Sequence, residues 1–166
     1  MSINTVWPLL AENLKDAHTL AIIGCGSLIR GDDAAGMVIA ERLTEPGENV
    51  RVYSGSTAPE NFTGEIKKFK PDVLLVIDAA DMALPPGEAA IIPPEKIDGV
   101  SFSTHTLPLK IMLEYLRKEI GCRPVLLGIQ GASYEFGADL TPAVRITVEQ
   151  VVQALSGVSC SLRRTP

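Results

Sequence analysis

The chain has 166 residues, of which 46% are hydrophobic and 21% charged, and its formal net charge at pH 7 is −5. This length and balance fit one globular domain and exclude a disordered chain. The acidic excess argues against a nucleic-acid-binding protein, which presents a basic face, and no apolar run approaches the roughly 18 residues of a membrane span.

Aliphatic runs of strand length alternate with segments of helical periodicity along the chain, a pattern typical of layered α/β domains. The run at 19–25 is apolar throughout and leads into glycine, which indicates a strand buried on both faces. In chain order the pattern predicts a helix at 7–16, a strand at 19–25, a helix at about 34–45, a strand at 49–53, a helix at 59–69, a strand at 72–77, a short strand at 88–92, a helix at 106–120, a strand at 124–129 and a helix at 142–155.

With right-handed crossovers, this order predicts an α/β fold, a three-layer αβα sandwich around a mainly parallel, twisted sheet of about five strands. The whole chain, 1–166, is expected to be one domain, with an N-terminal helical segment at 1–18 and a flexible tail at 156–166. Ligands of such sheets bind beyond the carboxyl ends of the strands. The segments that follow the strands are therefore the place to search for a site.

The cysteine content and the amino-terminal segment indicate the cellular compartment in which the protein is expected. Three cysteines without a CxxC pair fit neither a disulfide framework nor a zinc knuckle. The first residues carry acidic side chains and lack the apolar core of a secretory signal. We therefore expect a cytoplasmic protein with neither a membrane nor a nucleic acid as its partner.

A glycine-rich loop follows the first predicted strand, with the sequence GCGSLIRGDD at 24–33. Ile29 stands where a dinucleotide-binding loop has its third glycine, and Asp32 and Asp33 would repel a pyrophosphate at a helix start. An aspartate in this position most often caps the helix. Two adjacent residues cannot both do so, and one of the pair is expected to cap while the other projects into the crevice.

Two more polar residues stand at element ends. Asp78 follows the aliphatic strand at 72–77, where a carboxylate at the edge of an apolar interior needs a hydrogen-bond partner, a cation or a proton. His105 precedes the helix at 106–120, and the positive end of the helix dipole favours the neutral imidazole that binds metals. Taken singly, Asp78 has an alternative role as a turn-capping residue, and His105 as a structural histidine.

Taken together, two carboxylates and one imidazole are expected on the same rim of one sheet. Carboxylate oxygen and imidazole nitrogen suit a divalent ion such as nickel or zinc, with coordination positions left open. We expect Asp33 and His105 to be exposed at the rim, so that replacing either of them leaves folding intact.

At these residues the chain resembles the hydrogenase maturation endopeptidases, most of all the branch that processes the large subunit of group 4 NiFe hydrogenases, the formate-hydrogenlyase type. The similarity extends over about 19–155 and consists of ordered blocks. They are GCG followed by GDDAAG, STAPEN at 56–61, DAADM at 78–82, PGE at 86–88, STHTLPL at 103–109 and LGIQ at 127–130.

The resemblance implies a peptidase of three-layer α/β fold. Its substrate would be the NiFe-hydrogenase large-subunit precursor, already loaded with nickel, from which a short C-terminal extension is removed. The resemblance also implies that Asp33, Asp78 and His105 form the catalytic and metal-binding triad. Nickel would be supplied by the substrate, and other divalent ions would be able to occupy the site in vitro.

Several alternatives stay open at this point. Either a metal ion or an aspartate would activate the water, so both metal-assisted and aspartyl-protease mechanisms are compatible with the triad. A non-catalytic nickel carrier of the same fold and a nucleotide-binding module are the alternative functions. The sequence leaves open which hydrogenase is processed, where it is cleaved, the oligomeric state, and the roles of Asp32, Asp81 and Cys25.

Overall fold

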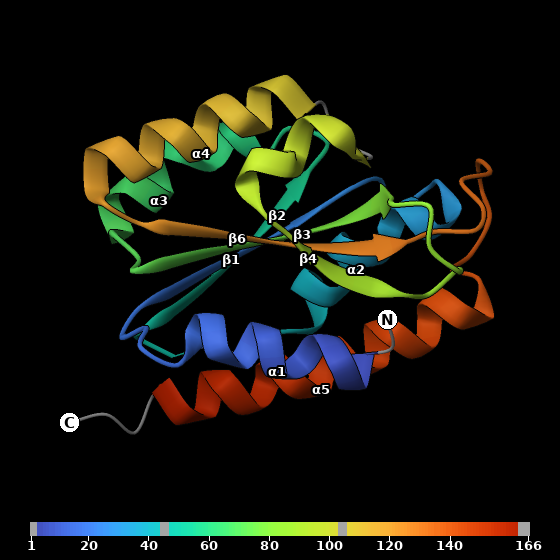
Figure 1. Cartoon of the computed structure of the whole chain (residues 1–166), viewed down its shortest axis with the longest axis horizontal. Coiled ribbons are helices and arrows are strands. Elements are labelled where there is room, and N and C mark those ends of the chain that lie inside the picture. The colour runs from blue at the N-terminus through green and yellow to red at the C-terminus, as the bar shows by residue number, and fades with distance from the viewer. Residues whose placement is uncertain (1–2, 44–46, 103–105, 163–166) are drawn as a thin grey trace.

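The fold was analysed in a computed structural model, which describes residues 3–43, 47–102 and 106–162. Its centre is a six-stranded sheet in the order β2-β1-β3-β6-β4, with β5 paired to β3 (Figure 1). The first three of these strands and β6 run parallel, whereas β4 and β5 are antiparallel to their neighbours. The strands are β1 Leu20–Cys25, β2 Val50–Ser56, β3 Val73–Asp81, β4 Ala89–Ile92, β5 Ser101–Phe102 and β6 Arg123–Gln130.

Helices cover both faces of this sheet, which confirms the expected three-layer sandwich (Figure 1). One face carries α1 Ile3–Leu14, α2 Ala35–Arg42 and α5 Pro142–Leu162. The other carries α3 Thr63–Phe69 and α4 Thr106–Ile120. Three short 3-10 turns complete the described elements: η1 Gly31–Ala34, η2 Pro59–Phe62 and η3 Pro94–Gly99. No helix within the described ranges is both long and apolar enough to cross a membrane.

Side chains of the central strands alternate between the two helical layers. In β1, Leu20 and Ile22 pack with α1, α2 and α5, while Ala21 and Ile23 pack with α3 and α4. A strand covered on both faces has no polar side to show in its sequence. This is why the run at 19–25 is apolar throughout, and why its prediction as a buried strand is confirmed.

The structure departs from the sequence predictions mainly at element ends. The helix expected at 34–45 is split into the turn η1 and the shorter α2. The strand expected to end before Asp78 continues to Asp81, because β6 and β5 still pair with it there. Helix α5 runs to Leu162, through most of the segment expected to be a tail at 156–166. The two-residue β5 was not predicted, since two residues show no periodicity.

A close contact between backbones fixes α2 against the sheet. An ideal Cβ at Gly24 of β1 would lie 2.0 Å from the carbonyl oxygen of Gly36 in α2. One at Gly36 would lie 2.2 Å from the carbonyl oxygen of Ile77 in β3. Only glycine permits this approach, and the contact sets the position of η1, which directly precedes α2.

Replacing Gly36 by alanine should therefore destabilise the fold. The new methyl group would meet backbone atoms, which cannot rotate away, and we expect a loss of about 3 kcal/mol in the free energy of unfolding, measured by urea titration. The control is Gly64→Ala in α3, where an added Cβ meets nothing within 4 Å. We expect that variant to stay within about 0.5 kcal/mol of the wild type. Equal stability of the two variants would contradict the close contact.

Candidate active site

An opening in the sheet arises because β1 ends before β3 does. The last β1–β3 pair is Gly24 with Ile77, and β3 then continues beside β6 as far as the pair Ala80–Gln130. On the edge that β1 has left, β5 pairs with β3, with Phe102 opposite Ala80. The chain leaving β1 turns into η1, which contacts β3. The acidic residues of both segments therefore belong to one end of the sheet, the carboxyl end, as predicted.

Asp33 has an incompletely satisfied carboxylate. Its side chain lies in η1 and the residue is only 5% exposed. Oδ2 accepts a hydrogen bond of 3.1 Å from the backbone N–H of Ser27, whereas Oδ1 is buried without a partner among the described residues. An unsatisfied buried carboxylate oxygen is costly. This oxygen is suited to accept a cation or a hydrogen-bond donor.

Asp78 is fully buried within β3. By strand alternation its side chain is on the face of Leu74 and Val76, which pack with α3 and α4. Asp33 is buried as well, so the expectation that it is exposed at the rim is wrong. β3 continues past Asp78 instead of ending there, and η1 packs against it, so both carboxylates are enclosed.

Cys25 lies at the end of β1, on the same face of the sheet as Asp78. Burial raises the pKa of the Cys25 thiol well above its ordinary value, and the carboxylates of Asp78 and Glu60 raise it further. In the protein without a metal ion the thiol is therefore uncharged at neutral pH, and its side chain is fully buried among apolar residues of the core. Cys25 accordingly acts as a packing residue in the core.

Asp32 has a different role from its neighbour. Its carboxylate is fully buried and accepts hydrogen bonds from the backbone N–H groups of Ala132 (2.8 Å), Ser133 (3.1 Å) and Thr141 (2.7 Å), and from the Thr141 hydroxyl. With these donors the carboxylate is saturated, and it does not substitute for Asp33. The prediction that one of the two aspartates caps a helix is wrong, because neither η1 nor α2 has a side-chain cap.

His105, the third expected ligand, lies outside the described residues, as do Ser103 and Thr104. The described residues on either side are Phe102, paired with β3, and Thr106, the first residue of α4. Within the described ranges, no group of three His, Cys, Asp or Glu side chains is arranged to hold a metal ion. The triad of Asp33, Asp78 and His105 therefore stays a prediction.

A cavity of about 290 Å³ opens at this end of the sheet and has Asp33 in its wall. Sequence reasoning missed Arg30 and Tyr134 as site residues, although Tyr134 does follow a strand, β6. The pKa of the Tyr134 hydroxyl is raised by burial, lowered in part by a hydrogen bond with the Gly131 backbone and raised further by the charges of Asp32, Asp81 and Asp33, so the hydroxyl stays protonated. The lining residues are Arg30, Asp33, Ala79, Asp81, Ser101, Phe102 and Tyr134.

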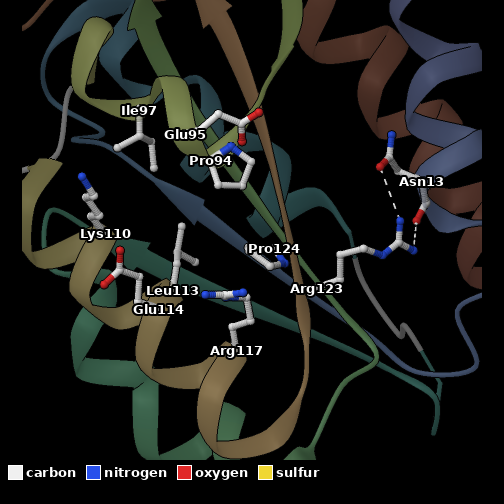
Figure 2. A pocket seen from close by; sticks show the side chains of 10 residues that line it. All are labelled: Asn13, Pro94, Glu95, Ile97, Lys110, Leu113, Glu114, Arg117, Arg123 and Pro124. Carbon is white, nitrogen blue, oxygen red and sulfur yellow. Dashed lines mark hydrogen bonds between the residues drawn. The ribbon is translucent and has the colours of Figure 1, made fainter.

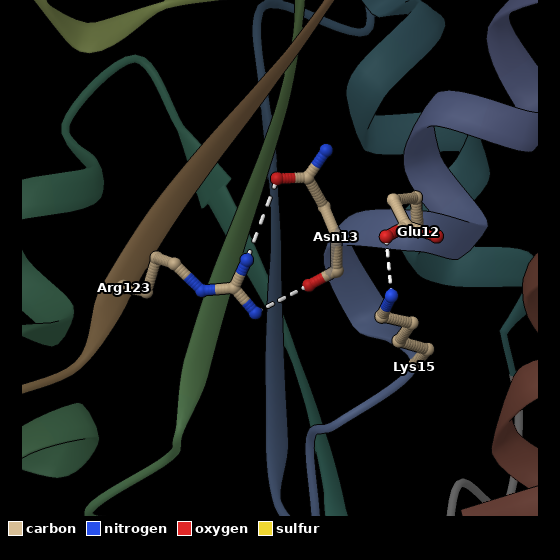
Figure 3. A network of polar contacts seen from close by, with 4 residues as sticks. All are labelled: Glu12, Asn13, Lys15 and Arg123. Carbon is tan, nitrogen blue, oxygen red and sulfur yellow. Dashed lines mark hydrogen bonds and ion pairs between the residues drawn. The ribbon is translucent and has the colours of Figure 1, made fainter.

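A larger cavity, of about 760 Å³, lies at the amino end of β6, and its lining includes Arg117, Arg123, Glu95 and Glu114 together with apolar residues (Figure 2). Arg123 is bound to α1, since it donates to the backbone and side-chain oxygens of Asn13 (Figure 3). Beside it, Lys15 pairs with Glu12. We assign the site to the smaller cavity, because that one holds the unsatisfied carboxylate oxygen of Asp33.

The fold and the enclosed carboxylates at the carboxyl end of a mainly parallel sheet define an α/β enzyme with an acidic site. The family model for hydrogenase maturation proteases matches residues 37–157, a stretch that includes Asp78 and begins just after Asp33. The chain belongs to this family, and the peptidase and the resemblance expected from the sequence are confirmed.

Individual relatives agree with this assignment. The hydrogenase 3 maturation protease of Escherichia coli K12 is 37% identical over 141 residues, which cover 84% of this chain and 90% of that protein. The crystal structure of the NiFe hydrogenase maturation protease HycI from Thermococcus kodakarensis superposes with a TM-score of 0.83 at 30% identity, covering 95% and 99% of the two chains. The solution structure of the endopeptidase HycI from Escherichia coli gives 0.71 at 36% identity, covering 84% and 90%.

The contrast between the two neighbouring aspartates predicts opposite effects on stability. Asp32→Asn replaces a saturated acceptor by an amide whose N–H₂ group faces donors, and we expect a loss of about 2–3 kcal/mol in the free energy of unfolding. Asp33→Asn removes a charge whose Oδ1 has no described partner, and we expect the stability to be unchanged or slightly higher. Urea titration of both variants at pH 7 measures the difference. A larger loss for Asp33→Asn than for Asp32→Asn would contradict the assignment.

Proposed function

We propose that this protein is the endopeptidase that removes the C-terminal extension of a nickel-loaded NiFe-hydrogenase large-subunit precursor. The observation that carries the proposal is the buried Oδ1 of Asp33, which has no partner in the described part of the chain and lies in the wall of a cavity at the carboxyl end of the sheet. Membership of the hydrogenase maturation protease family supports the reaction class and the partner.

In this proposal Asp33, Asp78 and His105 are the residues that contact the nickel of the precursor. Two observations support the fit. Carboxylate oxygen and neutral imidazole are donors that nickel accepts, and Asp33 keeps one oxygen without a described partner while the Ser27 N–H holds the other. The metal is cargo of the substrate, and its position would tell the peptidase that the precursor is loaded.

Peptide hydrolysis requires a water molecule to add to the scissile carbonyl carbon, with loss of a proton, before the C–N bond breaks and the amine leaves. A carboxylate of the site would accept that proton and return it to the leaving nitrogen. The enclosed position of Asp33 and Asp78 favours this, because charges act more strongly in surroundings of low dielectric constant. The metal ion of the precursor would supply additional polarisation of the carbonyl.

The geometry of the glycine-rich loop argues against the alternative function of a nucleotide-binding module. The glycine-rich loop leads into η1, a turn of only four residues in which both acidic side chains are buried, instead of opening a helix with free N–H groups. A pyrophosphate bound there would lie beside two carboxylates. No feature of the described residues favours a non-catalytic nickel carrier over the peptidase. An assay with excess precursor distinguishes the two functions, because only a peptidase cuts many precursor molecules per protein molecule.

The processing assay uses purified nickel-loaded precursor with a hundredth of an equivalent of the protein, and mass spectrometry to follow loss of the extension. We expect complete conversion by the wild type, and a rate at least about 100-fold lower for Asp33→Asn and for His105→Ala. Asp16→Asn, which changes an exposed carboxylate after α1, is the matched control and should process normally. Conversion limited to one equivalent or less would favour a carrier, and full activity of Asp33→Asn would contradict the role of its carboxylate.

Metal dependence is tested with the same precursor prepared without nickel. If the metal of the substrate is the recognition signal, the wild-type protein should leave the metal-free precursor uncut, and addition of Ni²⁺ that loads the precursor should restore the loss of mass. A zinc-loaded precursor serves as a comparison for specificity. Equal rates with and without metal would show that the triad acts on the peptide alone.

A further inference from the structure

Two loops that are distant in sequence form one unit beside the cavity. We call residues 131–141, between β6 and α5, the β6–α5 loop. It is joined to the loop after β1 by three backbone hydrogen bonds: Gly31 N–H to Ala138 (3.1 Å), Asp32 N–H to Ser133 (2.8 Å) and Gly137 N–H to Ile29 (2.7 Å). The β6–α5 loop is therefore placed by the segment that also carries Asp33.

Asp32 binds this loop at both ends. Its carboxylate accepts hydrogen bonds from Ala132 and Ser133 at the start, and from Thr141 at the end, immediately before α5. A buried carboxylate with several backbone donors is a strong, directional anchor, because charge-assisted hydrogen bonds are the stronger ones. Fixing both ends limits the conformations available to the residues between them.

Tyr134 is the residue of this loop that enters the cavity. It is half-buried and lies in the wall that also contains Asp33. Its hydroxyl packs over Gly131, where an ideal Cβ would lie 2.4 Å from that oxygen. The glycine thus leaves room for the Tyr134 ring against the backbone of its own loop, and from this position the ring lines the cavity.

We propose that Tyr134 is a substrate-binding residue that contacts the precursor peptide in the cavity, and that Asp32 is the residue that positions it. This inference rests on the proposed function. In it, the triad contacts the metal of the precursor, whereas Tyr134 contacts the peptide chain. The ring of Tyr134 would form an apolar wall against the peptide, and its hydroxyl would donate a hydrogen bond to a peptide carbonyl. Because these contacts exist before the bond breaks, they should act mainly on binding.

The first test measures KM and kcat separately with nickel-loaded precursor. We expect Tyr134→Ala to raise KM about tenfold with kcat within about threefold of the wild type, and Tyr134→Phe to raise KM by about threefold to tenfold through loss of the hydroxyl alone. The control, Glu135→Gln, changes the exposed neighbour in the same loop and should leave both constants unchanged. An unchanged KM for Tyr134→Ala, or a fall in kcat alone, would overturn the inference.

The second test asks whether Asp32 acts through Tyr134. Asp32→Asn should raise KM in the same way, and the double variant Asp32→Asn/Tyr134→Ala should be no worse than Tyr134→Ala alone. Additive increases in KM would contradict the positioning role. Should Asp32→Asn fail to fold, Thr141→Val removes one donor from the same carboxylate and takes its place in the cycle.

A binding measurement keeps this inference separate from the proposed function. In the Asp33→Asn background, which should not cut, titration calorimetry with the nickel-loaded precursor compares the Kd with and without Tyr134→Ala. Tyr134→Ala should raise that Kd about tenfold. A wild type that never cuts the precursor would refute the proposed function, whereas normal cutting together with an unchanged Kd for Tyr134→Ala would refute only the role of Tyr134.

Discussion

Two adjacent carboxylates are buried in one four-residue turn, and only one of them has its hydrogen-bonding capacity filled. Burial of a carboxylate is strongly unfavourable unless hydrogen bonds or a cation compensate for the lost water. Asp32 receives that compensation from the β6–α5 loop, and Asp33 receives, from the residues that the structure describes, one hydrogen bond, donated by the N–H of Ser27. Within a single turn, Asp32 thus anchors a distant loop, whereas Asp33 keeps one carboxylate oxygen without a partner among the described residues.

The packing of α2 on the sheet, together with the unequal lengths of β1 and β3, gives this turn its position. Because Gly24 and Gly36 lack side chains, α2 lies directly on β1, and η1 reaches the part of β3 that β1 leaves uncovered. The extension of β3 to Asp81 and its pairing with β5 then close the opposite side of the opening. The acidic site is thus a consequence of unequal strand lengths, with close backbone packing bringing the acids to it.

Sequence patterns predicted the elements that are governed by local periodicity. The apolar run of β1 and the amphipathic α4 were recognised because burial on two faces, or on one stripe, leaves a direct trace in the residue order. The carboxylate of Asp32 could not be interpreted in this way. Its partner Thr141 is 109 positions away along the chain, and nothing local distinguishes a helix cap from an anchor for a distant loop. The position of Tyr134 in the cavity wall was missed for the same reason, since no motif links it to the glycine-rich loop.

The burial of Asp33 limits which parts of a protein substrate can reach its carboxylate. With 5% of the residue exposed and a cavity of about 290 Å³ beside it, the carboxylate is out of reach of a broad, folded protein surface. A flexible chain end can enter such a space, because it needs room for only one strand of peptide at a time. A protease that removes a C-terminal extension works on a segment of that kind. The enclosure of Asp33, which contradicts the expectation that it is exposed at the rim, therefore agrees with the processing of a chain terminus better than with attack on loops held rigidly in a folded partner.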